Sequence, residues 1–294
     1  MQPIAPTQIE TPRDSATVVL LRDAPEGLQT LLLRRHAQMA NMAGVYVFPG
    51  GKLDAEDSAP ASAALLDQAP ERLHAGLGEP GIAPTTAAGL HVAALREALE
   101  ECGLLLAEAA TPQARLDAPL ARAQLRAGQP FAQVLAGLGL RLATRQLLPW
   151  SRWITPTSPA MSTRRFDTRF FVAPAPAGQT ALHDNEETTE SVWLAPRAAL
   201  EQYRDGAIDL APPQIMSLAQ LARYASVHSV LAAARAQRPP TILPEAFMDA
   251  GARTICYPGD PLHAVRERAL PGPTRLRQQG RWFLPEEGFE ALFA

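Results

Sequence analysis

Cysteine and lysine are nearly absent from the sequence. Among 294 residues there are two cysteines, Cys102 and Cys256, and no Cys or His spacing that is typical of zinc ligands. This excludes a disulfide framework and a zinc ribbon, and it predicts reduced, inert thiols. Lys52 is the only lysine, so arginine carries nearly all the positive charge. Alanine and proline are abundant as well, and we attribute the whole bias to genome base composition, not to thermostability.

Long apolar runs and a strong net charge are also lacking. The formal net charge is −3, so no global basic field favours nucleic acid or an anionic membrane as a partner. No stretch of about 18 apolar residues runs without a charge or a proline. The first residues lack a basic start followed by an apolar run. We therefore expect a cytoplasmic protein without nucleic-acid or membrane partners, built as one large domain or as a medium domain with an extension.

The order of strand-like and helix-like segments predicts an α+β protein. Residues 15–22 and 28–35 are short apolar runs on either side of a Pro25 and Gly27 turn, which is typical of a β-hairpin. A third run at 45–51 ends in two glycines, which allow the backbone to approach a ligand closely. Later runs alternate with helical periodicity, which favours layers of helices on a mixed sheet over a doubly wound parallel sheet. The later strand-like runs are 146–155, 164–173, 190–195, 252–258 and 277–285, and the helical ones are 112–140, from 196, and 212–235.

The segment REALEECGL, residues 96–104, places three carboxylates on one face of a predicted helix. Glu97, Glu100 and Glu101 share one arc at about 100° per residue, while apolar side chains occupy the other arc. Gly103 stands where a left-handed C-terminal cap is expected. An acidic face of this kind is most often simply solvated. Here few cations interleave with the acids, so the pattern equally suits a hard divalent ion such as Mg²⁺ or Mn²⁺.

Together, FPGGKLDAED and AALREALEECGL resemble the box of the Nudix hydrolase family. Gly51 matches the first glycine of that pattern, and the second half of the pattern matches Arg96, Glu97, Glu100, Glu101, Gly103 and Leu104. There are three departures from the pattern. Asp57 replaces a glutamate, the spacer expands to residues 58–95, and Ala98 replaces a larger aliphatic residue.

A wider resemblance is to the coenzyme A diphosphatase branch of that family, the nudix-motif-19-like proteins. It consists of the long insertion and of short matches at 50–57, 164–171, 210–214 and 257–260. The resemblance implies a Nudix α/β/α sandwich with a mixed sheet, spanning residues 12–207, with an insertion at about 58–91. Residues 208–294 would be a C-terminal helical extension that packs on the same domain. The sequence does not choose between a pocket, a dimer interface and a sheet cap for this extension, so a homodimer stays open.

The resemblance also implies a reaction, in which metal-activated water cleaves a nucleoside diphosphate linked to another group. It makes Glu100 and Glu101 the principal ligands of Mg²⁺ or Mn²⁺ and Glu97 a ligand or a base. Arg96 would orient a glutamate through charge-assisted hydrogen bonds. Members of the family often use another acid outside the box. The candidates for it are Glu187 and Glu190, ranked nearly equally and each more often a solvated loop acid when taken alone.

Several other residues are candidates for binding the substrate. Gly50 and Gly51 would lie beside the diphosphate. Arginines suit bidentate phosphate contacts, and the candidates are Arg34, Arg35, Arg164 and Arg165. Aromatic residues in strands are more often core than adenine platforms, and this applies to Trp150, Trp153 and Phe166. His183 is interpreted as a surface residue.

Three hypotheses follow. The first is a Mg²⁺- or Mn²⁺-dependent pyrophosphohydrolase that converts coenzyme A or an acyl-coenzyme A to 3′,5′-ADP and 4′-phosphopantetheine or its acyl form. The second is a hydrolase of the same fold that acts on ADP-ribose, NADH or dinucleotides. The third, from another class, is a non-catalytic Nudix-fold sensor that binds a nucleotide. Intact Glu97, Glu100 and Glu101 weigh against the sensor, whereas Asp57 and the expanded spacer keep it open.

Overall fold

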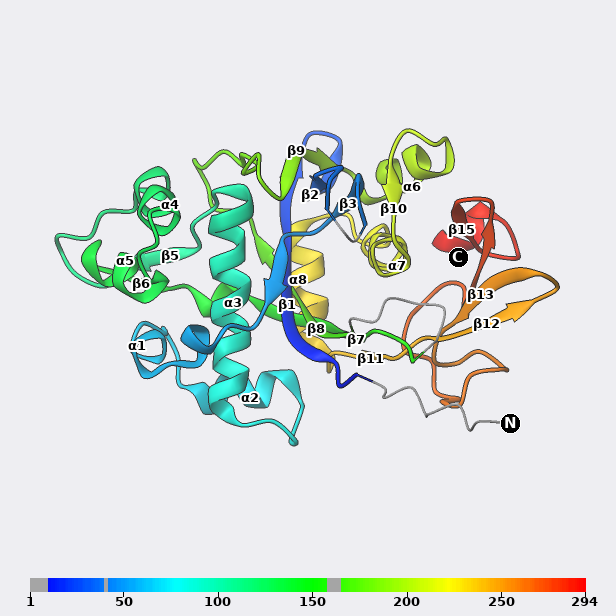
Figure 1. Ribbon diagram of the computed structural model, residues 1–294, viewed down its shortest axis with the longest axis horizontal. Coiled ribbons are helices and arrows are strands. Elements are labelled where there is room, and N and C mark those ends of the chain that lie inside the picture. Colours follow the sequence, from blue (N-terminus) through cyan, green and yellow to red (C-terminus); the bar gives the residue numbers. More distant parts are fainter. Residues whose placement is uncertain (1–9, 40–41, 158–164) are drawn as a thin grey trace, which may run out of the picture.

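The computed structural model describes residues 10–39, 42–157 and 165–294. Helices lie on both sides of a central sheet, with α3 on one side of β1 and α8 on the other (Figure 1). The helices are α1 (Pro60–Ala63), α2 (Pro70–Leu77), α3 (Pro84–Cys102), α4 (Ala118–Arg126), α5 (Phe131–Gly137), α6 (Pro196–Arg204), α7 (Pro212–Leu221) and α8 (Val227–Ala236). Short 3₁₀ turns are η1 (Ala55–Ser58), η2 (Thr144–Gln146) and η3 (Phe289–Phe293).

Within the described residues, nine strands form the central mixed sheet, in the order β10-β3-β2-β1-β8-β7-β11, with β4 paired to β1 and β9 to β2. They are β1 (Arg13–Ala24), β2 (Gly27–Arg35), β3 (Val45–Val47), β4 (Gly50–Lys52), β7 (Leu148–Ile154), β8 (Phe166–Pro174), β9 (Thr188–Leu194), β10 (Asp209–Leu210) and β11 (Thr241–Ile242). The pairing of β1 with β8 is parallel, whereas β1 with β2 and β7 with β8 are antiparallel. The predicted hairpin at 15–35 is therefore confirmed.

The third predicted strand, 45–51, is divided in two. β3 pairs with β2, and β4 pairs with β1 through Gly50 opposite Thr17 and Gly51 opposite Ala16. Pro49 lies at the break, and a proline has no N–H to donate to a strand ladder. This crossing brings the two glycines to the middle of β1, beside the acidic helix.

Side chains of β1 alternate between two cores, one on each face of the sheet. Val18 and Leu20 pack with α3, α4 and α5, whereas Val19 and Leu21 pack with α6, α7 and α8. The α/β/α sandwich is thus confirmed. Trp150 and Trp153 are buried in the second core, as expected for aromatic residues in strands.

The chain between η1 and the acidic residues is largely helical. It contains α1, α2 and the first turns of α3, which begins at Pro84 instead of near the box. Residues 84–91 therefore belong to the same helix as the predicted acidic face. Proline at the first helical position is favoured because its missing N–H would have no intrahelical partner there.

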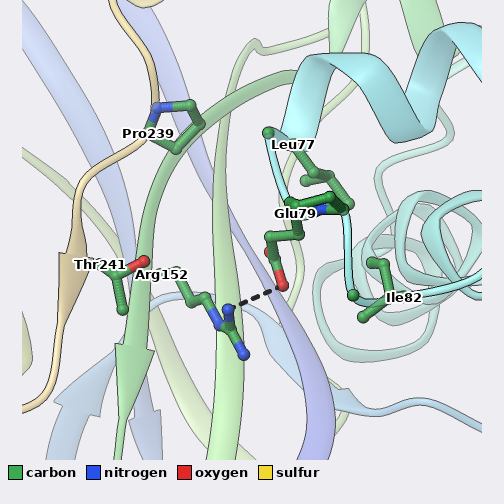
Figure 2. A pocket seen from close by; sticks show the side chains of 9 residues that line it. Leu77, Glu79, Ile82, Arg152, Pro239 and Thr241 are labelled. Carbon is green, nitrogen blue, oxygen red and sulfur yellow. Dashed lines mark ion pairs between the residues drawn. The ribbon is translucent and has the colours of Figure 1, made fainter.

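An ion-pair cluster ties this insertion to the sheet. Glu79 follows α2, and its carboxylate accepts hydrogen bonds from Arg169 of β8 at 2.9 and 2.6 Å and pairs with Arg152 of β7 at 3.0 Å. Figure 2 shows Glu79 and Arg152 facing each other in a cavity of about 290 Å³ whose other labelled residues include Leu77 and Pro239. Arg169 also pairs with Asp14 and Asp167. The charges in this cavity are mutually paired, so the cluster serves as a structural anchor.

The C-terminal part combines helices with a second sheet. α7 and α8 cover one face of the central sheet, and a four-stranded antiparallel sheet follows in the order β12-β13-β14-β15. Its strands are β12 (Glu245–Asp249), β13 (Ala252–Cys256), β14 (Arg275–Gln279) and β15 (Trp282–Leu284), and a separate pair is formed by β5 (Ala107–Ala109) and β6 (Leu140–Leu142). Among the described residues, no helix has both the length and the apolar character needed to cross a membrane.

Candidate active site

The acidic residues of the box occupy the last two turns of α3. The helix ends at Gly103, which has φ 69° and whose N–H bonds to the Leu99 carbonyl at 3.0 Å, so the predicted left-handed cap is present. The acidic face is covered to a large extent: Glu101 is 4 % exposed, and the side chains of Glu97 and Glu100 are 13 % and 37 % exposed. A face that served only for solubility would not be buried in this way.

Arg96 holds the acidic residues together. Its Nη1 donates to Glu97 at 2.9 Å and to Glu100 at 2.7 Å, and its Nε and Nη2 donate to the two oxygens of Asp57 at 2.9 and 3.0 Å. Asp57 is 3 % exposed and lies in η1. Asp57 is shorter than the glutamate of the pattern but still forms a bidentate pair with Arg96. This pair anchors η1, which precedes the insertion, to α3.

The glycine turn packs directly on the acidic helix. The Gly50 N–H donates to Glu101 Oε2 at 3.0 Å. A Cβ at Gly51 would lie 2.0 Å from Glu97 Oε1, and one at Gly50 would lie 2.5 Å from the Ala16 carbonyl oxygen. Gly50 therefore allows β4 to lie close to β1, and Gly51 allows it to lie close to the Glu97 side chain of α3.

The box carboxylates have raised pKa values. Burial raises the pKa of Glu97 to about 7, with Arg96 opposing the shift and Glu100 adding to it. Burial also raises the pKa of Glu100, and it raises that of Glu101 well above its usual range, with the charge of Glu97 adding to the effect. At Glu97 and Glu100, burial thus outweighs the opposing charge of Arg96.

A second wall faces these acids across a cavity of about 210 Å³. The loop before β9 supplies part of it. There, Asp184 Oδ1 accepts the backbone N–H groups of Glu186, Glu187 and Thr188 at 2.9, 3.1 and 2.8 Å, which fixes the loop. The residues that line the cavity are Glu97, Glu100, Glu101, Arg122, Leu125, Arg126, Asp184, Glu186 and Glu187.

The two candidate loop acids lie in different surroundings. Glu187 lines the cavity, and its charge contributes to the raised pKa values of Glu97 and Glu101. Glu190 lies within β9 opposite Arg34 and accepts a hydrogen bond from the Tyr46 hydroxyl at 2.7 Å. Burial and Glu190 raise the pKa of that hydroxyl to about 12. The structure therefore brings Glu187, and not Glu190, to the box acids.

The predicted phosphate-binding arginines are also separated. Arg35 acts electrostatically on Glu101, lowering its pKa, and its buried Nε has no hydrogen-bond partner among the residues that the structure describes. Arg34 lies 3.9 Å from Glu190, with its side chain 51 % exposed. Arg165 donates to the Thr155 and Glu10 carbonyls, away from the residues that line the cavity. Arg164 lies outside the described residues.

Several residues that line this cavity were not among the candidates from the sequence, and three of them form the hydrogen bonds that hold its walls. Arg122 and Arg126 lie on α4, and Asp184 lies on the loop before β9. The spacing of four between the two arginines places them on one face of a helix, which was an available signal. Nothing local indicates that this face meets the end of α3.

The donor set of the cavity suits a divalent metal ion. Carboxylate oxygens are the ligands that Mg²⁺ and Mn²⁺ favour. Burial raises the pKa values of Glu97 and Glu101, and a bound cation would favour their charged forms. In the part of the chain that the structure describes, no three His, Cys, Asp or Glu side chains are gathered as a finished metal centre. Arg96 Nη1 instead bridges Glu97 and Glu100. The carboxylates of Glu97, Glu100 and Glu101 are thus chemically suited to bind a divalent metal ion.

The fold and the acidic helix define the class of protein. A Nudix hydrolase from Alicyclobacillus acidocaldarius has a similar structure, with a TM-score of 0.60 and 26 % sequence identity, covering 76 % of this chain and 96 % of that chain. The fold is that of Nudix hydrolases, enzymes that cleave diphosphate bonds, generally with divalent metals, in substrates that contain a nucleoside diphosphate.

Within this class, the chain belongs to the family described as the NUDT19 Nudix domain, whose pattern matches residues 12–221. The human acyl-coenzyme A diphosphatase NUDT19 is 29 % identical over 275 residues, which cover 81 % of this chain and 73 % of the human protein. The Xenopus laevis protein of the same name is 26 % identical over 239 residues, 69 % of this chain. The match spans 62 % of the length of that frog relative. The chain is therefore a Nudix pyrophosphohydrolase of the NUDT19 branch.

Proposed function

We propose that the chain hydrolyses the diphosphate of coenzyme A or an acyl-coenzyme A, with Mg²⁺ or Mn²⁺, to 3′,5′-ADP and 4′-phosphopantetheine or its acyl form. The observation that carries the chemistry is the cavity in which Glu97, Glu100 and Glu101 line one space with Glu187. The choice of coenzyme A is supported by the resemblance to the acyl-coenzyme A diphosphatases named above.

Glu97, Glu100 and Glu101 would hold the divalent ion. When bound there, such an ion supplies charge neutralisation of the diphosphate and lowers the pKa of a coordinated water. Arg96 keeps Glu97 and Glu100 oriented through its two hydrogen bonds, and it is itself fixed by Asp57. The box arginine is thus a positioning residue in this proposal.

Glu187 is the residue we propose as the proton acceptor. Water attacks one phosphorus of the diphosphate, the bond from that phosphorus to the leaving oxygen breaks, and the proton of the water passes to a carboxylate oxygen. Glu187 comes from a loop and not from the box helix, so it can approach the water from another side. Arg35, near Glu101, would balance charge on the diphosphate.

The test is product analysis by mass spectrometry with Mg²⁺ or Mn²⁺. The substrates are coenzyme A, acetyl-coenzyme A, ADP-ribose, NADH and a diadenosine polyphosphate, each incubated with the purified wild type. We expect 3′,5′-ADP from coenzyme A and from acetyl-coenzyme A. Cleavage confined to ADP-ribose, NADH or dinucleotides would contradict the coenzyme A proposal and leave the diphosphate chemistry in place. Nucleotide binding without any cleavage would favour the sensor hypothesis instead.

A further inference from the structure

The acidic cavity contains two arginines that the proposed chemistry does not use. Both come from α4, where Arg122 and Arg126 are one turn apart. Asp117 caps the start of this helix by accepting a hydrogen bond from the Leu120 N–H at 3.0 Å. A capped helix therefore holds both cations beside the box acids.

Most of the hydrogen-bonding capacity of Arg122 is used by backbone carbonyls. Its Nε and Nη2 donate to the Glu100 carbonyl at 3.1 and 2.8 Å, Nη2 also reaches the Glu101 carbonyl at 3.1 Å, and Nη1 donates to the Leu182 carbonyl at 2.8 Å. These carbonyls belong to the end of α3 and to the loop that carries Glu187. Arg122 thus joins the box helix to this loop and commits four of its five N–H groups to backbone carbonyls.

Arg126 differs from Arg122 in both exposure and contacts. It is exposed, and its Nη2 donates to the Asp184 carbonyl at 3.0 Å. Among the described residues, the ion pairs of Asp, Glu and Arg side chains do not include Arg126, although Asp184, Glu186 and Glu187 line the same cavity. The bond to Asp184 fixes one end of the guanidinium, and the side chain is exposed while it lines the cavity.

We infer that Arg126 determines specificity by binding the phosphomonoester of the substrate, the phosphate that is not cleaved. This inference rests on the proposed function, because coenzyme A carries such a group as its 3′-phosphate. Glu97 and Glu101 are buried and mark the floor of the cavity, where the diphosphate is cleaved, whereas Arg126 lies at its exposed margin. A guanidinium already held on one side is suited to a bidentate contact with phosphate.

The experiment compares coenzyme A with dephospho-coenzyme A, which lacks only the 3′-phosphate. Both are cleaved with Mg²⁺ by the wild type, Arg126→Ala, Arg126→Lys and the control Arg115→Ala. Arg115 precedes α4, its side chain is 68 % exposed, and it does not line the cavity. The values to measure are kcat and KM for each enzyme and substrate.

We expect Arg126→Ala to lower kcat/KM for coenzyme A by about ten- to a hundredfold, mainly through KM, because a charge-assisted contact is lost. Its kcat/KM for dephospho-coenzyme A should stay within about twofold of the wild type by the same reasoning. Arg126→Lys should be intermediate on coenzyme A, and Arg115→Ala should match the wild type on both substrates.

Two results would overturn the inference about Arg126. An equal loss on both substrates would mean that Arg126 acts on the shared diphosphate or on the loop of Glu187. An unchanged kcat/KM for coenzyme A would mean that no contact exists. Failure of the proposed function looks different, because the wild type itself would then cleave neither substrate.

Discussion

Gly51 lies where β4 and α3 come closest. Because a Cβ there would lie 2.0 Å from Glu97 Oε1, Gly51→Ala must push the carboxylate or the strand away. We expect a loss of about 1–3 kcal/mol in the free energy of unfolding and a fall in kcat of at least about tenfold, since the metal-binding acid moves. Urea unfolding and steady-state kinetics measure both. The control is Gly137→Ala, because a Cβ at Gly137 meets nothing within 4 Å. This variant should lower neither the free energy of unfolding nor kcat. A fully active Gly51→Ala would contradict this role.

Glu187 and Glu190 can now be distinguished by their surroundings. We predict that Glu187→Gln lowers kcat by about a hundredfold or more, as expected for loss of a general base. Glu190→Gln should retain kcat within about threefold, because a neutral amide can still accept the Tyr46 hydrogen bond. Steady-state kinetics on the same substrate tests both variants. Near-normal turnover of Glu187→Gln would remove this residue from the mechanism. A large loss of kcat in Glu190→Gln would assign the role of proton acceptor to Glu190 of β9.

His91 makes stability depend on pH. It is buried in α3, its Nδ1 donates to the Ala87 carbonyl at 2.8 Å, and its ring lies 4.6 Å from that of Phe171. Burial lowers its pKa from 6.5 to about 4. Between these values the unfolded chain binds a proton that the folded chain does not, so this contribution to stability is present above pH 6.5 and is lost as pH falls toward 4.

The measurable consequence is a slope in the free energy of unfolding between pH 6.5 and 4. His91 should contribute up to about 3 kcal/mol of the loss across this range. Residue 91 no longer titrates in this range in His91→Gln. The slope of its unfolding free energy should therefore correspond to the uptake of about one proton fewer on unfolding. Urea unfolding at several pH values measures the slopes of both proteins. Equal slopes would show that His91 is protonated in the folded state.

Among the elements, those set by local signals were predictable from the sequence. The β1–β2 hairpin and the end of α3 at Gly103 depend on turn and cap residues within a few positions. The start of α3 at Pro84 could not be predicted, because the preceding Ala-, Pro- and Gly-rich stretch carries no clear helical period. The sequence also left Glu187 and Glu190 nearly equal, since distinguishing their surroundings depends on where β9 begins opposite β2. The bulge of β2 between Arg34 and Arg35 accompanies that start.

One acidic side chain of the insertion forms ion pairs with two strands of the central sheet. Glu79 pairs with Arg169, whose side chain is 2 % exposed, and with Arg152. We predict that Glu79→Gln lowers the free energy of unfolding by about 3 kcal/mol, because a buried arginine loses a charged partner. The control Glu108→Gln breaks the exposed pair with Arg141 and should cost less than about 1 kcal/mol. Urea unfolding measures both. Equal effects would show that the anchor is not important for stability.

At the scale of the whole molecule, the part beyond residue 207 belongs to the sandwich. β10 and β11 extend the central sheet, and α7 and α8 bury one of its faces. The family match likewise continues to residue 221. We propose that residues 208–294 fold together with residues 12–207 as one unit. Cytoplasmic localisation and a homodimer stay predictions.

The central claim is that the acidic end of α3 binds the metal ion that supports cleavage of a nucleoside diphosphate. The most direct measurement is the rate of coenzyme A cleavage by metal-stripped enzyme, before and after addition of Mg²⁺ or Mn²⁺, beside Glu100→Gln. We expect no cleavage without the ion, recovery on its addition, and a loss of about a hundredfold or more in the variant. Cleavage that continues in the stripped enzyme, or at a normal rate in Glu100→Gln, would contradict a metal site at this end of α3.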